Sequence, residues 1–250
     1  MISEVLGTLT PFDWGILAIA AFLAGLVRGF TGFGSALVFM PLAGSVLPPV
    51  QAIVTGIVID LIGTSVVVPG ALKDARRTDL KRLFLGLLVG VPLGLMILGR
   101  ISPDVFRYTV SLAALAMLAV LITGFRFKSP PGPKGTVAIG GLGGLLGASA
   151  GLPGPPVILA YVAGPHGPAV IRANTMIYLY GFDIYAIAAI FLTAAAPPGA
   201  LLLGVVFSLP NMMGNLTGAR LVNPNHEKTY RVVAYVIIGA SALLSLPLLG

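Results

Sequence analysis

The chain has 250 residues, of which 57% are hydrophobic and only 9% charged, and its mean hydropathy is +1.01. So little polar surface cannot cover a soluble globule of this size, and we expect lipid to solvate the chain. The formal net charge of +7 comes from basic residues in short loops, which indicates membrane orientation rather than nucleic-acid binding. The chain has no cysteine and only two histidines, which lie far apart, and this argues against a thiol enzyme, a metal site or a cofactor.

Charged residues, glycines and prolines divide the chain into apolar segments. A membrane-spanning helix needs about 20 apolar residues, and in lipid each backbone N–H and C=O must be satisfied within the chain, so these segments predict helices. Residues 1–14 carry acidic but no basic side chains, unlike a cleaved signal peptide, so we expect the first segment to remain in the mature protein. The predicted segments are 14–28, 33–47, 50–71, 83–99, 105–124, 136–149, 154–164, 171–195, 199–218 and 230–249.

Two pairs of segments differ from ordinary spans. Residues 28–34 (RGFTGFG) separate the first pair, and residues 150–156 (AGLPGPP) separate the sixth segment from the seventh. Short helices on either side of a glycine or proline break cannot each cross a bilayer at full length. We therefore predict that both pairs are short or re-entrant.

The two breaks occupy corresponding places in two halves of the chain. Residues 25–32 match residues 144–151 at an offset of 119 positions (144 − 25), and Pro49 and Pro168 keep the same offset. We predict an all-α integral membrane protein of eight to ten helices in two repeats, 1–128 and 129–250, with about five helical segments each. The alternative is that small residues at helical spacing imitate a repeat by composition alone.

Basic residues predict the orientation of the chain in the membrane. By the positive-inside rule, the loops with most Lys and Arg face the cytoplasm. With an odd number of crossings in each half, both termini lie outside and the second repeat is inverted relative to the first, as in many secondary transporters. Only Arg100 and Arg107 then lie outside, and the basic residues inside are Lys73, Arg76, Arg77, Lys81, Arg82, Arg126, Lys128, Lys134, Arg172, Arg220, Lys228 and Arg231.

The breaks are candidate binding sites for an anion. The start of a helix exposes unpaired N–H groups and the positive end of its dipole, glycine allows close approach, and hydroxyls and Arg28 add donors and charge. The alternatives are that Arg28 snorkels to the interface and that the glycines serve helix packing. The candidate substrate-binding residues are Arg28, Gly29, Thr31, Gly32, Gly34, Ser35, Ser149, Gly151, Gly154, Asn174 and Asn211. Asparagine that joins helices by hydrogen bonds is an equal alternative for the last two.

Two aspartates lie inside predicted spans, where ionisable groups are costly and usually functional. Asp60 belongs to segment 50–71 and Asp183 to segment 171–195, the corresponding segments of the two halves. They are candidate coupling residues that carry protons or hold an arginine. Alternatively, they cap or hydrogen-bond a kinked neighbouring helix.

The glycine patterns at residues 25–35 and 144–156, with Pro41, Pro49 and Ala52, resemble the sulfite exporter TauE/SafE family over nearly the whole chain. The resemblance implies a permease of the bacterial inner membrane with two related halves, and family members are associated with export of sulfite, sulfoacetate and other sulfur-containing or organic anions. The second half departs from the first at three positions. It has Pro153, Pro155 and Pro156 where the first half has Gly34, Ala36 and Leu37.

Our leading hypothesis is a secondary transporter, most simply an exporter, that moves a small anion such as sulfite or an organosulfonate by alternating access and is coupled to protons. Its partners are then the anionic substrate, the lipid bilayer and protons, with no indication of oligomeric state. An anion channel would use the same site. A non-transporting membrane assembly factor is a third class, and without a recognisable catalytic motif we expect no enzyme.

Overall fold

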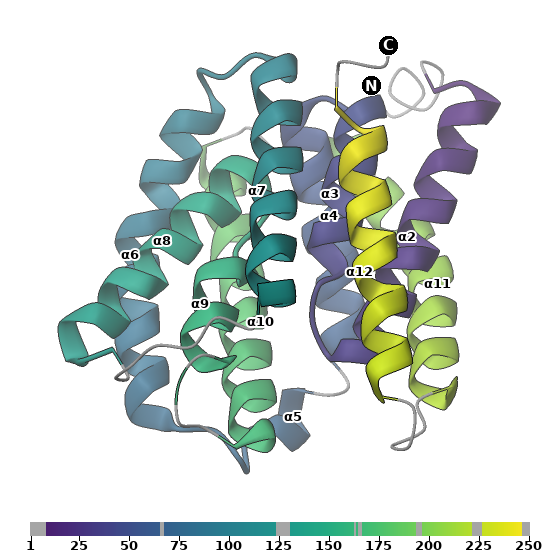
Figure 1. Ribbon diagram of the computed structural model, residues 1–250. Coiled ribbons are helices and arrows are strands. Elements are labelled where there is room, and N and C mark those ends of the chain that lie inside the picture. The colour runs from purple at the N-terminus through teal and green to yellow at the C-terminus, as the bar shows by residue number, and fades with distance from the viewer. Residues whose placement is uncertain are drawn as a thin grey trace.

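The computed structural model describes residues 9–65, 68–123, 131–162, 164, 167–193, 197–221 and 227–246. Every regular element within these ranges is a helix, as the composition predicts. Figure 1 shows them as a bundle of long, roughly aligned helices. They are α2 (Pro11–Thr31), α3 (Ser35–Val46), α4 (Pro49–Ser65), α5 (Val68–Ala71), α6 (Arg77–Leu98), α7 (Pro103–Thr123), α8 (Pro133–Ala150), α9 (Gly154–Val162), α10 (Pro168–Leu192), α11 (Pro198–Leu221) and α12 (Glu227–Leu244).

Local chemistry explains where the helices at the two breaks start and stop. The hydroxyl of Thr10 and the carboxylate of Asp13 form a capping box at the start of α2. Gly32 ends α2 at φ +79°, Gly34 precedes α3 at φ +90°, and Gly151 ends α8 at φ +70°. These left-handed conformations favour glycine. Both predicted breaks are therefore present.

Within the described residues, five helices are long and apolar enough to cross a membrane: α2, α6, α7, α10 and α11. The chain is a multi-pass membrane protein. Within the first pair, α2 is longer than predicted at 21 residues, whereas α3 has 12. The predicted segment 50–71 is described as α4 and the one-turn α5, and residues 66–67 between them lie outside the described residues.

The surface of the bundle suits lipid. Large exposed side chains on the outer helices are apolar, among them Leu85 and Val89 on α6 and Leu209 and Met213 on α11. Figure 1 places these helices on opposite flanks of the bundle. Contiguous exposed apolar surface of this kind is stable only against a membrane or a partner.

Glycines bring two pairs of helices into backbone contact. A Cβ at Gly90 of α6 would lie 2.1 Å from the carbonyl oxygen of Gly141 on α8, and one at Gly25 of α2 would lie 2.0 Å from that of Asn211 on α11. These are the two most extensive helix interfaces of the described chain. Each pair joins one helix from residues 1–128 to one from residues 129–250, so the two halves interleave.

The helices form two groups on either side of α7 in Figure 1, one with α6, α8, α9 and α10 and the other with α2, α3, α4, α11 and α12. The figure also shows α6 and α11 running in opposite directions, which an inverted repeat requires of these corresponding helices. The repeat itself, with its boundary near residue 128, stays a prediction.

The basic residues that the structure describes gather at one end of the bundle. Lys73, Arg76 and Arg77 lie where α5 meets α6, the lower end in Figure 1, and Arg100 lies where α6 meets α7 at the other end. This is the asymmetry that the orientation prediction requires. Arg126, Lys128, the side chains of Lys228 and Arg231, and both chain ends lie outside the described residues.

Candidate functional site

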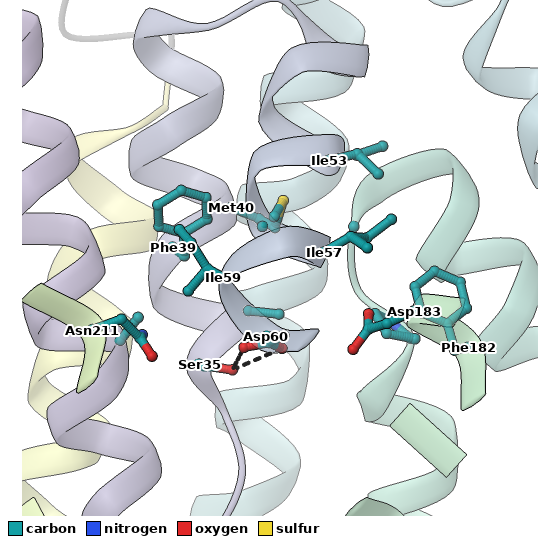
Figure 2. A pocket seen from close by; sticks show the side chains of 15 residues that line it. Ser35, Phe39, Met40, Ile53, Ile57, Ile59, Asp60, Phe182, Asp183 and Asn211 are labelled. Carbon is teal, nitrogen blue, oxygen red and sulfur yellow. Dashed lines mark hydrogen bonds between the residues drawn. The ribbon is translucent and has the colours of Figure 1, made fainter. Parts of the chain in front are cut away.

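A cavity lies between the two groups of helices. The space between its walls, counted with the part that is open to solvent, is about 400 Å³. Figure 2 shows its lining side chains, which come from both halves of the chain. The lining residues are Ala24, Ser35, Ala36, Phe39, Met40, Ile53, Gly56, Ile57, Ile59, Asp60, Gly151, Pro153, Phe182, Asp183 and Asn211.

Asp60, which lines the cavity, forms an ion pair with Arg28 behind the cavity wall. The Arg28 guanidinium lies 2.6 Å from the Asp60 carboxylate, and its second terminal nitrogen donates to the Thr64 hydroxyl at 3.2 Å. The Ser35 hydroxyl lies 3.2 and 3.3 Å from the two Asp60 oxygens (Figure 2). Arg28 is only 7% exposed and does not reach the interface by snorkelling. The pair joins the end of α2 to α4 beside the first break.

Asp183 lies across the cavity from Asp60. Its side chain projects from α10 into the same space, and Figure 2 shows the two carboxyl groups on facing sides. Asp183 is 4% exposed, yet it forms no hydrogen bond or ion pair with any described residue. Both predicted coupling residues therefore belong to one site, in different electrostatic settings.

Asn211 contributes a third polar side chain. Its amide nitrogen donates to the Ala21 carbonyl at 3.0 Å, which fixes the side chain between α11 and α2. Its amide oxygen has no partner within the described chain, although the residue is only 1% exposed. Buried acceptors are normally satisfied, so this oxygen can accept a hydrogen bond from water or a ligand in the cavity.

The two breaks are not equivalent as anion sites. Ser35 and Ala36 begin α3 and line the cavity, and the first N–H groups of a helix have no partner within that helix. At the second break, Pro155 and Pro156 follow Gly154 at the start of α9 and have no N–H. The donors that we expected at both breaks are therefore concentrated at the first.

The cation is also confined to one half. At the offset of 119 positions, Gly147 corresponds to Arg28. A Cβ at Gly147 would lie 2.4 Å from the ring of Phe182, so this ring occupies the space where a side chain would start. Asp183 consequently has no arginine in the place that Arg28 takes beside Asp60.

Four of the predicted residues at the first break shape the backbone instead of lining the cavity. Gly29 packs against α11, where its Cβ would lie 2.5 Å from the Asn215 carbonyl oxygen. Gly32 and Gly34 supply the left-handed turns. The Thr31 hydroxyl lies 2.6 Å from the Phe33 carbonyl oxygen, so it braces the turn.

In the second half, Gly151 lines the cavity, but three other predicted residues do not. The Ser149 hydroxyl donates to the Leu145 carbonyl one turn earlier in α8. Gly154 begins α9. Asn174 accepts a hydrogen bond from the Arg76 N–H at 2.8 Å and donates to the Tyr161 hydroxyl at 2.6 Å, so it joins α10 to α9 and to the segment before α6.

The sequence motifs do not predict the apolar lining of the cavity. Phe39, Met40, Ile53, Ile57 and Phe182 enclose most of the cavity. An apolar residue inside an apolar helix carries no signal that separates cavity lining from lipid contact. Thr64 was detectable, because it lies one helical turn after Asp60.

The sequence model described as sulfite exporter TauE/SafE matches residues 17–245. The chain belongs to this family. No curated protein and no solved structure matches the chain. TauE/SafE proteins are membrane transporters of sulfite-type anions, and the match includes both breaks and every residue that lines the cavity.

Proposed function

We propose that this protein is a secondary transporter of the bacterial inner membrane that exports a small sulfur oxyanion, sulfite or an organosulfonate, by alternating access. The observation that carries the proposal is the buried Arg28 guanidinium beside a cavity that also receives the start of α3. A buried guanidinium with adjacent helix N–H groups suits an oxyanion.

The anion would bind beside Asp60 and share the Arg28 guanidinium with it. A sulfonate or sulfite group carries three oxygens, which can accept from the guanidinium, from the Ser35 hydroxyl and from the N–H groups that begin α3. Asp60 and Ser35 are already hydrogen-bonded to each other, so the same donors serve the carboxylate in the empty site. Substrate and Asp60 then share the Arg28 guanidinium.

The apolar lining favours an organosulfonate over bare sulfite. Phe39, Met40, Ile57 and Phe182 enclose the side of the cavity away from the ion pair. A short carbon chain loses water there at low cost, whereas a bare dianion would leave this surface unused.

Alternating access would come from rocking of the two helix groups. In the cavity between them, Asp60 and Ser35 lie on one side and Phe182 and Asp183 on the other (Figure 2). The tight glycine interfaces lie within the groups, α2 with α11 and α6 with α8. We expect these interfaces to move as rigid bodies and the cavity walls to separate.

The test is flux through the purified protein in liposomes. Labelled sulfite and a panel of short sulfonates are followed in wild type, in Arg28→Lys and in the double variant Arg28→Gln/Asp60→Asn. Saturable efflux and counterflow in wild type, weakened in Arg28→Lys and lost in the double variant, support a carrier. Flux without saturation or counterflow indicates a channel, and no flux of any panel anion overturns the substrate class.

Access can be checked separately, because the chain has no native cysteine. In Ser35→Cys, an impermeant thiol reagent should react from each side of the membrane, and a sulfonate should slow the reaction. Reaction from one side only, without protection by any panel anion, contradicts alternating access at this cavity.

A further inference from the structure

Asp183 is a buried acid that forms no hydrogen bond or ion pair with a described residue. The charged groups that act on it are Asp60 on α4 and Arg28 on α2. The other described elements that pack on α10 are α5, α6, α8 and α9. None of them brings a charged side chain close to Asp183. The Arg28 guanidinium is already ion-paired with the Asp60 carboxylate, with Nη1 and Oδ1 2.6 Å apart.

The charges of the site do not balance if an anion is added. With Asp183 ionised, Arg28 faces two carboxylates and the cavity carries one net negative charge. A bound monoanion would make two in a place largely removed from water, where like charges repel strongly. With Asp183 protonated, the empty cavity is neutral and the anion adds only its own charge.

We propose that Asp183 takes up one proton when the anion binds and releases it when the anion leaves, so that one proton and one monoanion cross together. The inference rests on the proposed function and deepens it by naming the coupling ion and its carrier. The proton comes from water on the side where the anion enters and returns to water on the side where it leaves. No bond to the anion forms or breaks.

Protonation also gives Asp183 a role in binding. A neutral carboxyl has an O–H donor, which an ionised carboxylate lacks. The Asp183 carboxyl group lies across the cavity from Asp60 and Ser35, where the anion would bind. The second half of the site has few hydrogen-bond donors, and it thus gains one only when the anion is bound and Asp183 is protonated.

Asp60 is the poorer candidate for the proton carrier. Its carboxylate already accepts hydrogen bonds from the Arg28 guanidinium and the Ser35 hydroxyl. Asp183 has neither contact, since Gly147 and Gly154 stand where Arg28 and Ser35 stand in the first half at the offset of 119 positions. Because the two halves differ at these positions, Asp60 pairs with Arg28 and Asp183 carries the proton.

The coupling has a consequence for direction. A proton and a monoanion that move together carry no net charge, so the membrane potential neither helps nor opposes them. An acidic exterior then opposes export, and outward flux is driven by accumulation of the anion inside. This distinguishes the mechanism from proton–anion exchange, in which an acidic exterior would drive export.

The test uses an alkanesulfonate, because it stays a monoanion across the working pH range and, unlike sulfite, carries no exchangeable proton of its own. Liposomes loaded with the sulfonate and a trapped pH dye are diluted into sulfonate-free buffer. In wild type the interior should become more alkaline in step with efflux, at one proton per anion. Asp183→Asn should lose the alkalinisation. Asp104→Asn, an exposed aspartate at the start of α7, is the matched control and should behave as wild type.

A binding measurement keeps the proposal testable if a variant fails to transport. Titration calorimetry of the purified protein with the sulfonate, in two buffers of different ionisation enthalpy, counts the protons taken up. Uptake in wild type and its loss in Asp183→Asn support the assignment. Efflux without proton movement, acidification during efflux, or unchanged proton uptake in Asp183→Asn overturns it and leaves the proposed transport function standing. Absence of both binding and flux overturns both.

Discussion

Arg28 and Asp60 are separated by 32 positions in the sequence, and their ion pair holds the last turn of α2 against α4 at one wall of the cavity. Ser35, the first residue of α3, hydrogen-bonds the same carboxylate. One carboxyl group therefore fixes three helices around the first break. The same contacts occupy the donors that an anionic substrate would need.

Removal of one partner of this pair should be more damaging to stability than removal of both. Arg28→Gln leaves the Asp60 carboxylate without its counter-ion in a nearly buried place, and we expect a loss of about 3 kcal/mol in unfolding free energy. Arg28→Gln/Asp60→Asn should recover much of that loss, because no charge remains unpaired. Thermal unfolding in detergent gives the ranking. A double variant as unstable as the single one contradicts a favourable pairing.

Asn174 should matter for stability and not for substrate affinity, since it lies outside the cavity. Asn174→Leu removes the acceptor for the Arg76 N–H and the donor to Tyr161. We expect a loss of about 2 kcal/mol, because the buried Asn174 side chain loses two hydrogen bonds, each of which contributes about 1 kcal/mol. Detergent unfolding together with the KM for sulfonate efflux separates the two effects. A large change in KM at wild-type stability would restore Asn174 as a substrate contact.

The glycines in the α2–α11 and α6–α8 interfaces should not tolerate even a methyl group. In Gly90→Ala and Gly25→Ala the new Cβ would lie about 2 Å from a carbonyl oxygen, so the helices must separate, at a cost of about 1–3 kcal/mol or more. Gly15→Ala, also in α2 but with no atom within 4 Å of its Cβ, is the control. It should be neutral or slightly stabilising. Equal unfolding temperatures for all three would argue against close helix packing.

The orientation can be mapped with single cysteines at the two ends of α6. Thr78 lies at the end rich in basic residues and Ser102 just beyond the opposite end, and both side chains are exposed. In intact cells an impermeant thiol reagent should label Ser102→Cys and leave Thr78→Cys unreacted until the membrane is opened. Neither change removes a basic residue. The reverse labelling would invert the predicted topology.

Much of the fold follows from local sequence. The lengths of the apolar segments predict membrane helices, because a helix in lipid satisfies its own backbone. Gly32, Gly34 and Gly151 mark the breaks because the backbone there adopts positive φ. Asp60 and Asp183 stand out because charge inside an apolar segment is costly. These signals need no knowledge of which helices touch.

The partners of the polar groups depend on the tertiary structure. No local signal distinguishes Gly29, which packs against α11, from Gly151, which lines the cavity. The same holds for the two asparagines: Asn174 binds the segment before α6, whereas Asn211 has an amide oxygen without a described partner at the cavity. Such roles are set by which helix faces meet, and helical periodicity is the same on a face that meets another helix and on one that meets a ligand. The sequence by itself determined that this is a helical membrane protein with two glycine breaks and two intramembrane aspartates. Only the packing of α2, α4 and α10 decided that one aspartate is paired with Arg28 and the other is not.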